Sequence, residues 1–314
     1  MKVFDVLVVG ELNVDLILNK IQGFPEIGKE IVSEELNITL GSSSAIFASN
    51  LSALGTKVAF LGKIGNDSFS KLVKTSLENK KVDTGFIISS DHYKTGLTVV
   101  MNYGMDRANV TFPGAMEYLT EKDISDTVLS QAKHLHLSSI FFQTGLKKDV
   151  SKLFKRAKKL GLTTSMDPQW DPAEKWDLNI LELLPYVDIF LPNAQEFKYI
   201  TNSTNLRSGL EKIKSFAKTI VIKNGENGAQ LWHQESLLTK PAFLNKNVTD
   251  CIGAGDSFDA GFISEFLKGK NLERCLEVGN IMGAINTTAS GGTTAFENIR
   301  SIKEIAATKF LFDL

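Results

Sequence analysis

The sequence is poor in cysteine and proline, with only 2 and 7 of these residues among 314. Two cysteines cannot build the disulfide framework of a small secreted domain, and neither Cys251 nor Cys275 belongs to a CxxC pair. We therefore expect a protein of the reducing cytoplasm in which both cysteines are small buried apolar residues.

An excess of charge of one sign is also lacking, because 35 Lys and Arg stand against 36 Asp and Glu. Proteins that bind nucleic acids or anionic membrane surfaces electrostatically carry basic patches or a basic excess. No apolar run reaches the ~18 residues that a membrane helix requires. We therefore expect no nucleic-acid partner and no membrane partner.

The chain alternates short β-branched runs with segments of helical periodicity. The expected strands are 4–10, 58–61, 134–142, 162–166, 187–191 and 219–223, and the expected helices include 41–55, 69–78, 149–160 and 206–217. This alternation predicts an α/β fold with a doubly wound, mostly parallel sheet flanked by helices. Two insertions, at about 14–40 and 85–114, interrupt it and predict a small antiparallel β lid. We expect 1–314 to form a single domain.

The sharpest motif is the run Gly253-Ala254-Gly255-Asp256, which leads directly into residues with helical spacing. Free backbone N–H groups at the start of a helix form an anion site, and glycine lets the backbone approach a phosphate closely. The aspartate is then either a helix cap or a general base beside the phosphate. The sequence contains no P-loop pattern, and the glycines do not match a dinucleotide-binding fingerprint.

With this motif the sequence resembles the ribokinase-like (PfkB) family of carbohydrate and nucleoside kinases. The family signature D-T-x-G-A-G-D-x-F is matched by residues 250–258, with Cys251 in place of threonine. Four further segments, 10–15, 41–55, 188–196 and 222–229, follow in family order. The resemblance covers nearly the whole chain. It implies a ribokinase-like fold and transfer of the γ-phosphoryl group of ATP to a hydroxyl of a small sugar.

The resemblance also assigns roles around the phosphates. Asp256 would be the general base, and the amides of Gly253, Ala254 and Gly255 would hold charge on the transferred phosphoryl group. Asn193 and Glu196 match the N-x-x-E pattern that helps to bind Mg²⁺, largely through water, although Glu196 also fits an ordinary first-turn helix residue. The residues expected to bind the nucleotide are Lys223, Asn224, Gly225, Gly228 and Asn280. Asp250 matches a monovalent-cation site, which implies K⁺.

For the acceptor, Asn13 and Asp15 follow the first strand, where open α/β sheets place their ligands. Gly41 and Ser42 correspond to the Gly-Gly pair of the family. Ser42 replaces the second glycine, Ser43 stands where ribokinase has lysine, and Ile46 where asparagine is common, so ribose or fructose specificity is not implied.

Two alternatives remain open on these residues. A nucleoside kinase would use Ile46 and Phe47 as a more apolar acceptor wall. A sugar-binding protein without turnover is the other alternative, against which the intact glycine motif argues.

Other residues allow two interpretations each. Arg107 fits contact with an acidic or phosphorylated substrate, or a solvated turn. Trp170 and Phe112 fit stacking on a substrate, or packing. His134 and His136 share a strand face as metal ligands do, but no third ligand is near them in sequence. The resemblance further implies a homodimer formed through the lid.

Overall fold

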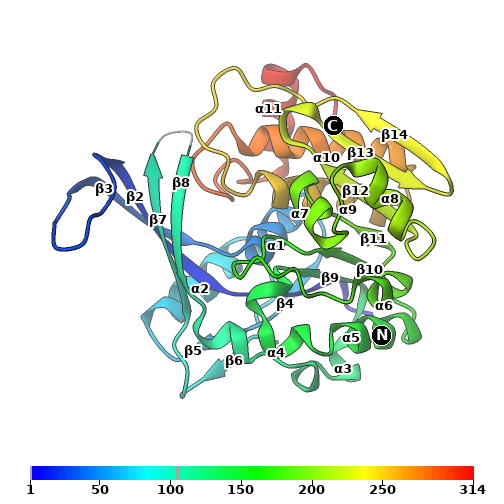
Figure 1. The fold of residues 1–314 in the computed structure, drawn as a ribbon, viewed down its shortest axis with the longest axis horizontal. Helices are drawn as coiled ribbons and strands as arrows, with labels where there is room; N and C mark the ends of the chain where they lie inside the picture. Colours follow the sequence, from blue (N-terminus) through cyan, green and yellow to red (C-terminus); the bar gives the residue numbers. More distant parts are fainter. Residues whose placement is uncertain (1, 104–105) are drawn as a thin grey trace.

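The structure is a computed structural model that describes residues 2–103 and 106–314. Its main sheet has eight strands in the order β14-β13-β12-β11-β10-β9-β1-β4 (Figure 1). The strands are β1 (Phe4–Val9), β4 (Val58–Leu61), β9 (Ala132–Ser138), β10 (Thr163–Asp167), β11 (Ile189–Phe190), β12 (Thr219–Lys223), β13 (Ala229–His233) and β14 (Ser236–Lys240). All neighbours from β4 to β12 are parallel, and β13 and β14 add an antiparallel edge.

Helices cover both faces of this sheet, as parallel strands with crossover connections require. One face packs against α1 (Ser43–Ala53), α2 (Ser68–Asn79), α9 (Ala254–Leu267), α10 (Leu272–Asn286) and α11 (Ile299–Phe310). The other packs mainly against α5 (Val150–Lys159), α7 (Ala194–Ile200) and α8 (Leu206–Ile213), with the short helices α3 (Asp126–Leu129), α4 (Thr144–Lys147) and α6 (Ile180–Leu183). The doubly wound fold predicted from the alternation is confirmed.

The expected strand 134–142 is too long. β9 ends at Ser138, because Ser139 adopts a left-handed backbone with φ of 54° and residues 140–142 form a 3-10 turn. A left-handed residue breaks the extended conformation, so the chain leaves the sheet at this point. This exit brings Ser139 and Phe142 to the pocket described below.

A second sheet, in the order β3-β2-β7-β8, projects from one side of the molecule (Figure 1). It contains β2 (Asn13–Ile21), β3 (Ser33–Leu40), β7 (Gly96–Tyr103) and β8 (Asp106–Phe112), and a small pair of strands, β5 (Lys63–Gly65) and β6 (Ile88–Ser90), lies apart. The pairs β2–β3 and β7–β8 are antiparallel, but the central pair β2–β7 is parallel. Arg107 lies in β8; residues 104–105 of the expected turn lie outside the described residues.

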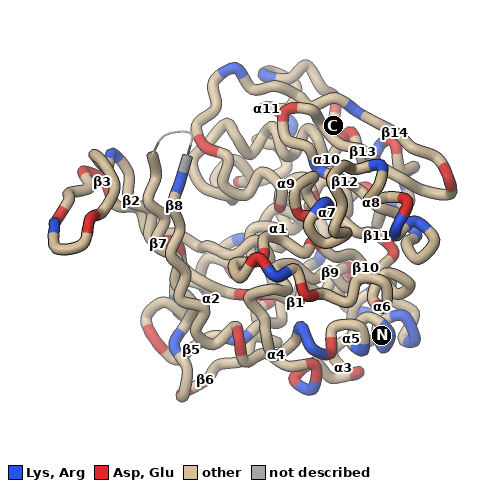
Figure 2. Tube along the Cα trace, in the orientation of Figure 1, with Lys and Arg blue, Asp and Glu red and all other residues tan. Residues whose placement is uncertain are grey.

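Charged residues of both signs are interspersed along the trace (Figure 2), as the balanced composition predicts. Among residues 2–103 and 106–314, no helix is long and apolar enough to cross a membrane.

Candidate active site

A pocket of about 1040 Å³ opens at the carboxyl ends of the parallel strands and reaches the second sheet. Its wall includes nearly all the residues singled out from the sequence: Asn13, Asp15, Ser42, Asn193, Glu196, Lys223, Asn224, Gly225, Gly228, Gly253, Ala254, Gly255, Asp256 and Asn280. Gly41 and Asp250 are not among the residues that line the pocket. The structure thus brings together segments that are up to 267 residues apart in the chain, from Asn13 to Asn280.

The glycine motif forms a turn at the start of α9. Gly253 is the N-cap residue, and its φ of 78° is left-handed. A Cβ atom there would lie 2.7 Å from the Cα of Gly292, so glycine is required for both reasons. Asp256 is in the first helical turn and does not cap the helix.

Three amides of this turn are available to an anion. In the described part of the chain, the N–H groups of Gly253, Gly255 and Asp256 have no acceptor, whereas that of Ala254 donates to the Cys251 carbonyl at 3.3 Å. Free N–H groups at the start of a helix of 14 residues favour a bound phosphate.

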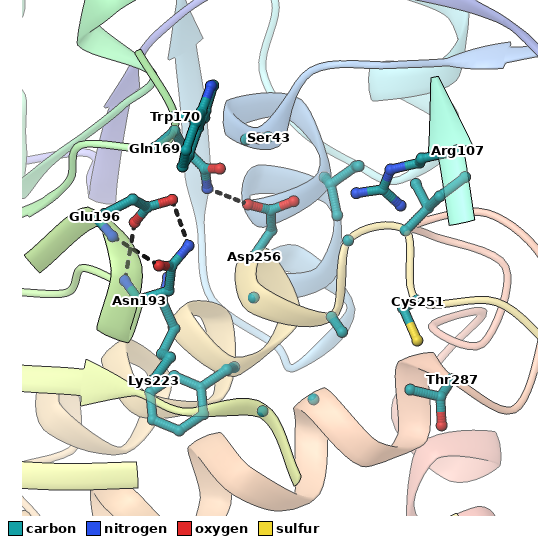
Figure 3. A pocket seen from close by; sticks show the side chains of 18 of the residues that line it. Ser43, Arg107, Gln169, Trp170, Asn193, Glu196, Lys223, Cys251, Asp256 and Thr287 are labelled. Carbon is teal, nitrogen blue, oxygen red and sulfur yellow. Dashed lines mark hydrogen bonds between the residues drawn. The ribbon is translucent and has the colours of Figure 1, made fainter. Parts of the chain in front are cut away.

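The side chain of Asp256 is buried beside this turn (Figure 3). Burial raises the pKa of Asp256 well above its usual range, and the carboxylates of Asp167, Glu11 and Glu196 add to the rise, while Lys223 opposes it. A carboxyl group with a raised pKa is a better proton acceptor than an exposed aspartate, which suits a general base.

Lys223, expected at the nucleotide, directs its ammonium to two buried carboxylates. Its Nζ donates to Asp167 Oδ2 at 2.7 Å and to both Asp259 oxygens at 3.0 and 3.1 Å. These carboxylates outweigh the effect of burial and raise the pKa of Lys223 above its usual range, so the lysine stays charged. Sequence reasoning missed this cluster, because nothing in the linear order connects Asp167, Lys223 and Asp259.

Asn193 and Glu196 form the capping box at the start of α7 and also line the pocket, and their role in binding Mg²⁺ stays a prediction. The Asn193 side chain accepts from the N–H groups of Gln195 and Glu196, and the Glu196 carboxylate accepts from Asn193 Nδ2 at 2.6 Å (Figure 3). Burial, with Asp167 nearby, raises the pKa of Glu196 to about 8.

The side-chain oxygen atoms of Asn193 and Glu196 are ligands of the kind that Mg²⁺ prefers. Among the described residues, no group of three or more His, Cys, Asp or Glu side chains is placed to hold a metal ion. A cation bound here would therefore take most of its ligands from water and from phosphate oxygens.

At the other end of the pocket, Asn13 and Asp15 form a polar pair. Asn13 Nδ2 donates to Asp15 Oδ1 at 2.8 Å and to Thr98 Oγ1 at 3.0 Å. A Cβ on Gly41 would lie only 2.3 Å from Asp15 Oδ1, which explains the glycine there. Burial raises the pKa of Asp15 to about 6. Both hydrogens of Asn13 Nδ2 are thereby used, so the pair offers acceptor oxygens to the hydroxyl groups of a ligand.

Ser42 occupies its glycine position with a left-handed backbone, at φ of 72°. This conformation costs a non-glycine residue roughly 1–2 kcal/mol. The Ser42 hydroxyl compensates by donating to the Glu11 carbonyl at 2.7 Å and accepting from the N–H of Ala45 at 2.9 Å, which caps α1.

The apolar wall proposed for a nucleoside acceptor is only half present. Ile46 lines the pocket, but Phe47 is buried and stacks on the ring of His136, with ring centroids 3.6 Å apart. Successive residues of an α-helix point about 100° apart, and here Phe47 faces His136 on β9 while Ile46 faces the pocket.

Glu11 is a pocket residue that sequence reasoning missed. It lies two residues after the end of β1, and its carboxylate accepts from the Ser44 hydroxyl and from the Ser44 N–H at 3.2 Å. Burial raises the pKa of Glu11 to about 7, although the contacts with Ser44 oppose the rise. Its position at the end of the first strand was the available signal.

Glu11→Gln is expected to stabilise the protein above neutral pH. Because the pKa of Glu11 rises from 4.5 to about 7 on folding, the native carboxyl binds a proton that the unfolded one has lost. Stability of the wild type therefore falls as the pH rises from 4.5 to 7, by about 3 kcal/mol, and glutamine removes this loss. Urea unfolding at pH 5 and pH 8 measures the difference; an advantage of glutamine that does not grow with pH contradicts it.

Two residues that the sequence assigns to the nucleotide and cation sites hold loops in place. Asn280 Nδ2 donates to the carbonyls of Lys240 and Pro241 at 3.4 and 3.1 Å. The Asp250 carboxylate accepts from Ile252 N–H, Ser290 hydroxyl and Gly291 N–H at 2.8–2.9 Å, which ties two loops together behind the turn.

The expectation that both cysteines are buried is wrong for one of them. Cys275 is fully buried, but Cys251 is exposed and lines the pocket (Figure 3).

The structure also shows where the aromatic and histidine side chains lie. Trp170 lines the pocket with its ring held edge-on by Trp176, whereas Phe112 is exposed and outside the pocket wall. His134 and His136 are buried, and each ring forms a hydrogen bond of 2.7 Å with the Ser165 hydroxyl, which lies between them.

Free amides for an anion, a buried carboxylate beside them and a polar pair for hydroxyl groups are the parts of a phosphoryl-transfer enzyme. The sequence model described as pfkB family carbohydrate kinase matches residues 3–299. The chain belongs to this family and is a carbohydrate kinase.

Individual comparisons agree with this membership. An uncharacterized sugar kinase of Archaeoglobus fulgidus is 29% identical over 74% of this chain and 92% of its own length. An ATP-dependent 6-phosphofructokinase of Thermoanaerobacterium thermosaccharolyticum is 25% identical over 99% of this chain and 96% of its own. The structure of Arabidopsis thaliana ribokinase complexed with ribose and ATP shares the fold, with a TM-score of 0.83 and 22% identity, and covers 96% of this chain and 98% of its own.

Proposed function

We propose that this protein transfers the γ-phosphoryl group of ATP to a hydroxyl group of a small sugar, with Asp256 as general base. The observation that carries the proposal is the turn at Gly253 and Gly255, whose free amides lie beside the buried Asp256 carboxylate in the pocket that also contains Asn13 and Asp15. The proposal includes a cytoplasmic location, because the two cysteines fit a reducing compartment.

In the proposed reaction the sugar hydroxyl oxygen forms a bond to the γ-phosphorus as the bond to the ADP oxygen breaks. Asp256 accepts the hydroxyl proton, and the Gly253 and Gly255 amides hold the charge on the phosphoryl oxygens. Asn13 and Asp15 orient the sugar by its other hydroxyl groups. When bound near Asn193 and Glu196, Mg²⁺ supplies charge neutralisation to the phosphates.

The remaining residues assigned to the nucleotide and to K⁺ are part of the same proposal. Asn224, Gly225, Gly228 and Asn280 surround the nucleotide, and Asp250 supports a K⁺ site. The lid consists of the insertions 14–40 and 85–114 and lies on the acceptor side of the site. Residues 1–314 form a single domain. A closed lid would keep water from competing as the phosphoryl acceptor.

An ADP-release assay tests the function directly. The acceptors are ribose, fructose, keto-acid sugars, adenosine and inosine, each measured in potassium, sodium and choline buffers. Turnover on a sugar is expected; binding of a ligand without ADP release from any acceptor would contradict the proposal. Turnover on a nucleoside alone would favour a nucleoside kinase, and equal rates in the three buffers would remove K⁺.

The second sheet also supports the proposed homodimer. Its strand register aligns two rows of apolar residues on one face: Ile38, Leu16, Val99 and Val110, and next to them Leu36, Leu18, Met101 and Ala108. The opposite face carries Asp15, Thr98 and Thr111 and lines the pocket, so the apolar face points away from it. Val110 and Leu36 are 62% and 53% exposed. In a homodimer with two-fold symmetry, the same apolar face of a second copy of the chain covers this one.

Val110→Glu is expected to convert a dimer into a monomer, because a charge at the centre of an apolar interface loses its hydration. Light scattering after size exclusion measures the mass. Leu237→Glu on β14 is the matched control, since Leu237 is 60% exposed on the other sheet. A wild-type protein with the mass of one chain contradicts the dimer.

A further inference from the structure

The carboxylate of Asp256 has a single protein hydrogen-bond partner among the described residues. Gln169 Nε2 donates to its Oδ1 at 2.9 Å, which is drawn as a dashed line in Figure 3. Oδ2 accepts no hydrogen bond from residues 2–103 or 106–314. Gln169 therefore fixes one oxygen of this carboxylate, Oδ1, and leaves the other free.

The Gln169 amide is held by another carboxylate on its other side. Its Nε2 also donates to Asp167 Oδ2 at 2.6 Å, and its backbone N–H donates to Asp167 Oδ1 at 3.3 Å. A side-chain amide nitrogen has two donor hydrogens and no charge, so it bridges two adjacent acids without adding charge to the cluster. Neither a second carboxylate nor an alkyl side chain can do this.

These contacts close into a ring. Asp167 accepts from Lys223, Lys223 also pairs with Asp259, and Asp259 lies one helical turn after Asp256 on α9. The ring therefore ties the first turn of α9 to the carboxyl ends of β10 and β12, and Gln169 is the member that reaches Asp256.

Gln169 makes this contact from a backbone conformation that is unfavourable for glutamine. Its φ of 59° is left-handed, a conformation that costs a non-glycine residue roughly 1–2 kcal/mol. Asparagine adopts this conformation more readily, but its side chain is one methylene shorter. The length of glutamine is what the bridge between Asp167 and Asp256 requires.

We propose that Gln169 is a positioning residue: it holds one oxygen of Asp256 so that the other faces the acceptor hydroxyl. This inference rests on the proposed function, because it requires Asp256 to act as the base. It assigns to Gln169 an effect on turnover rather than on substrate affinity.

Gln169→Gly is the decisive variant, since glycine accepts the left-handed backbone and removes the whole side chain with its amide. We expect kcat to fall about 10- to 100-fold, with KM for ATP within about twofold and no loss of thermal stability. Gln169→Asn is expected to lose kcat as well, because its amide is too short. Gln234→Gly is the matched control: Gln234 also has a left-handed backbone, with φ of 46°, but is exposed in the turn between β13 and β14, so activity should not change.

The outcomes separate this inference from the function on which it rests. Wild-type kcat in Gln169→Gly or Gln169→Asn, together with an inactive Asp256→Asn, would overturn the positioning role and leave the kinase assignment intact. A fall in activity matched by a fall in melting temperature would also overturn it, since it would show a structural role. Full activity in Asp256→Asn would instead remove the base.

Discussion

Replacing Asp256 with asparagine is expected to lower kcat about 1,000-fold, which would be the largest effect of any substitution considered. Asparagine is nearly the same size and still accepts the hydrogen bond from Gln169, but its amide cannot take the proton of the sugar hydroxyl. KM for ATP should change little, because the Gly253 and Gly255 amides remain. Steady-state ADP release with the best acceptor measures both constants.

Stability provides the internal control for Asp256→Asn. Burial and three neighbouring carboxylates raise the pKa of Asp256, so the native state does not favour its charge. Removing that charge should leave the melting temperature unchanged or raise it. An enzyme that loses activity and stability together would point to misfolding, and one that keeps wild-type kcat would show that another group is the base.

Lys223→Met is expected to have the largest effect on stability. The substitution leaves Asp167 and Asp259 buried without their shared cation, and breaking a buried ion pair from one side costs about 3–5 kcal/mol. Burial raises the pKa of Asp259 and Lys223 opposes the rise, so the loss should shrink at acidic pH, where the Asp259 carboxyl binds a proton. Urea unfolding between pH 5 and pH 8 measures the free energy of unfolding.

Lys158→Met is the matched control for this prediction. Lys158 pairs with Asp188 at 2.5 Å, but Asp188 keeps a second partner, Lys218 at 2.7 Å, and both lysines are more exposed than Lys223. We expect a loss of about 1 kcal/mol or less. If Lys223→Met costs no more than Lys158→Met, the buried cluster does not stabilise the fold.

The sequence alone determined the architecture and the position of the chemistry. The alternation of strands and helices depends on local periodicity, which each segment carries by itself, and it predicted the parallel sheet. The run from Gly253 to Asp256 is contiguous, so its backbone turn and its carboxylate are also encoded locally. The family resemblance placed Asn13, Asp15, Asn193 and Glu196 in one site, and all four line the pocket.

The tertiary structure alone decided which neighbours those residues have. Phe47 faces His136 rather than the pocket, and Cys251 is exposed rather than buried, because packing selects the face that each side chain presents. Gln169 and Asp256 are 87 residues apart, and the lysine that balances Asp167 comes from another strand. Hydrogen bonds between distant segments leave no periodic signal in a sequence, since they depend on where strand ends converge after folding. The proposed base, Asp256, is therefore recognisable from its motif, and the network that holds it is visible only in the folded chain.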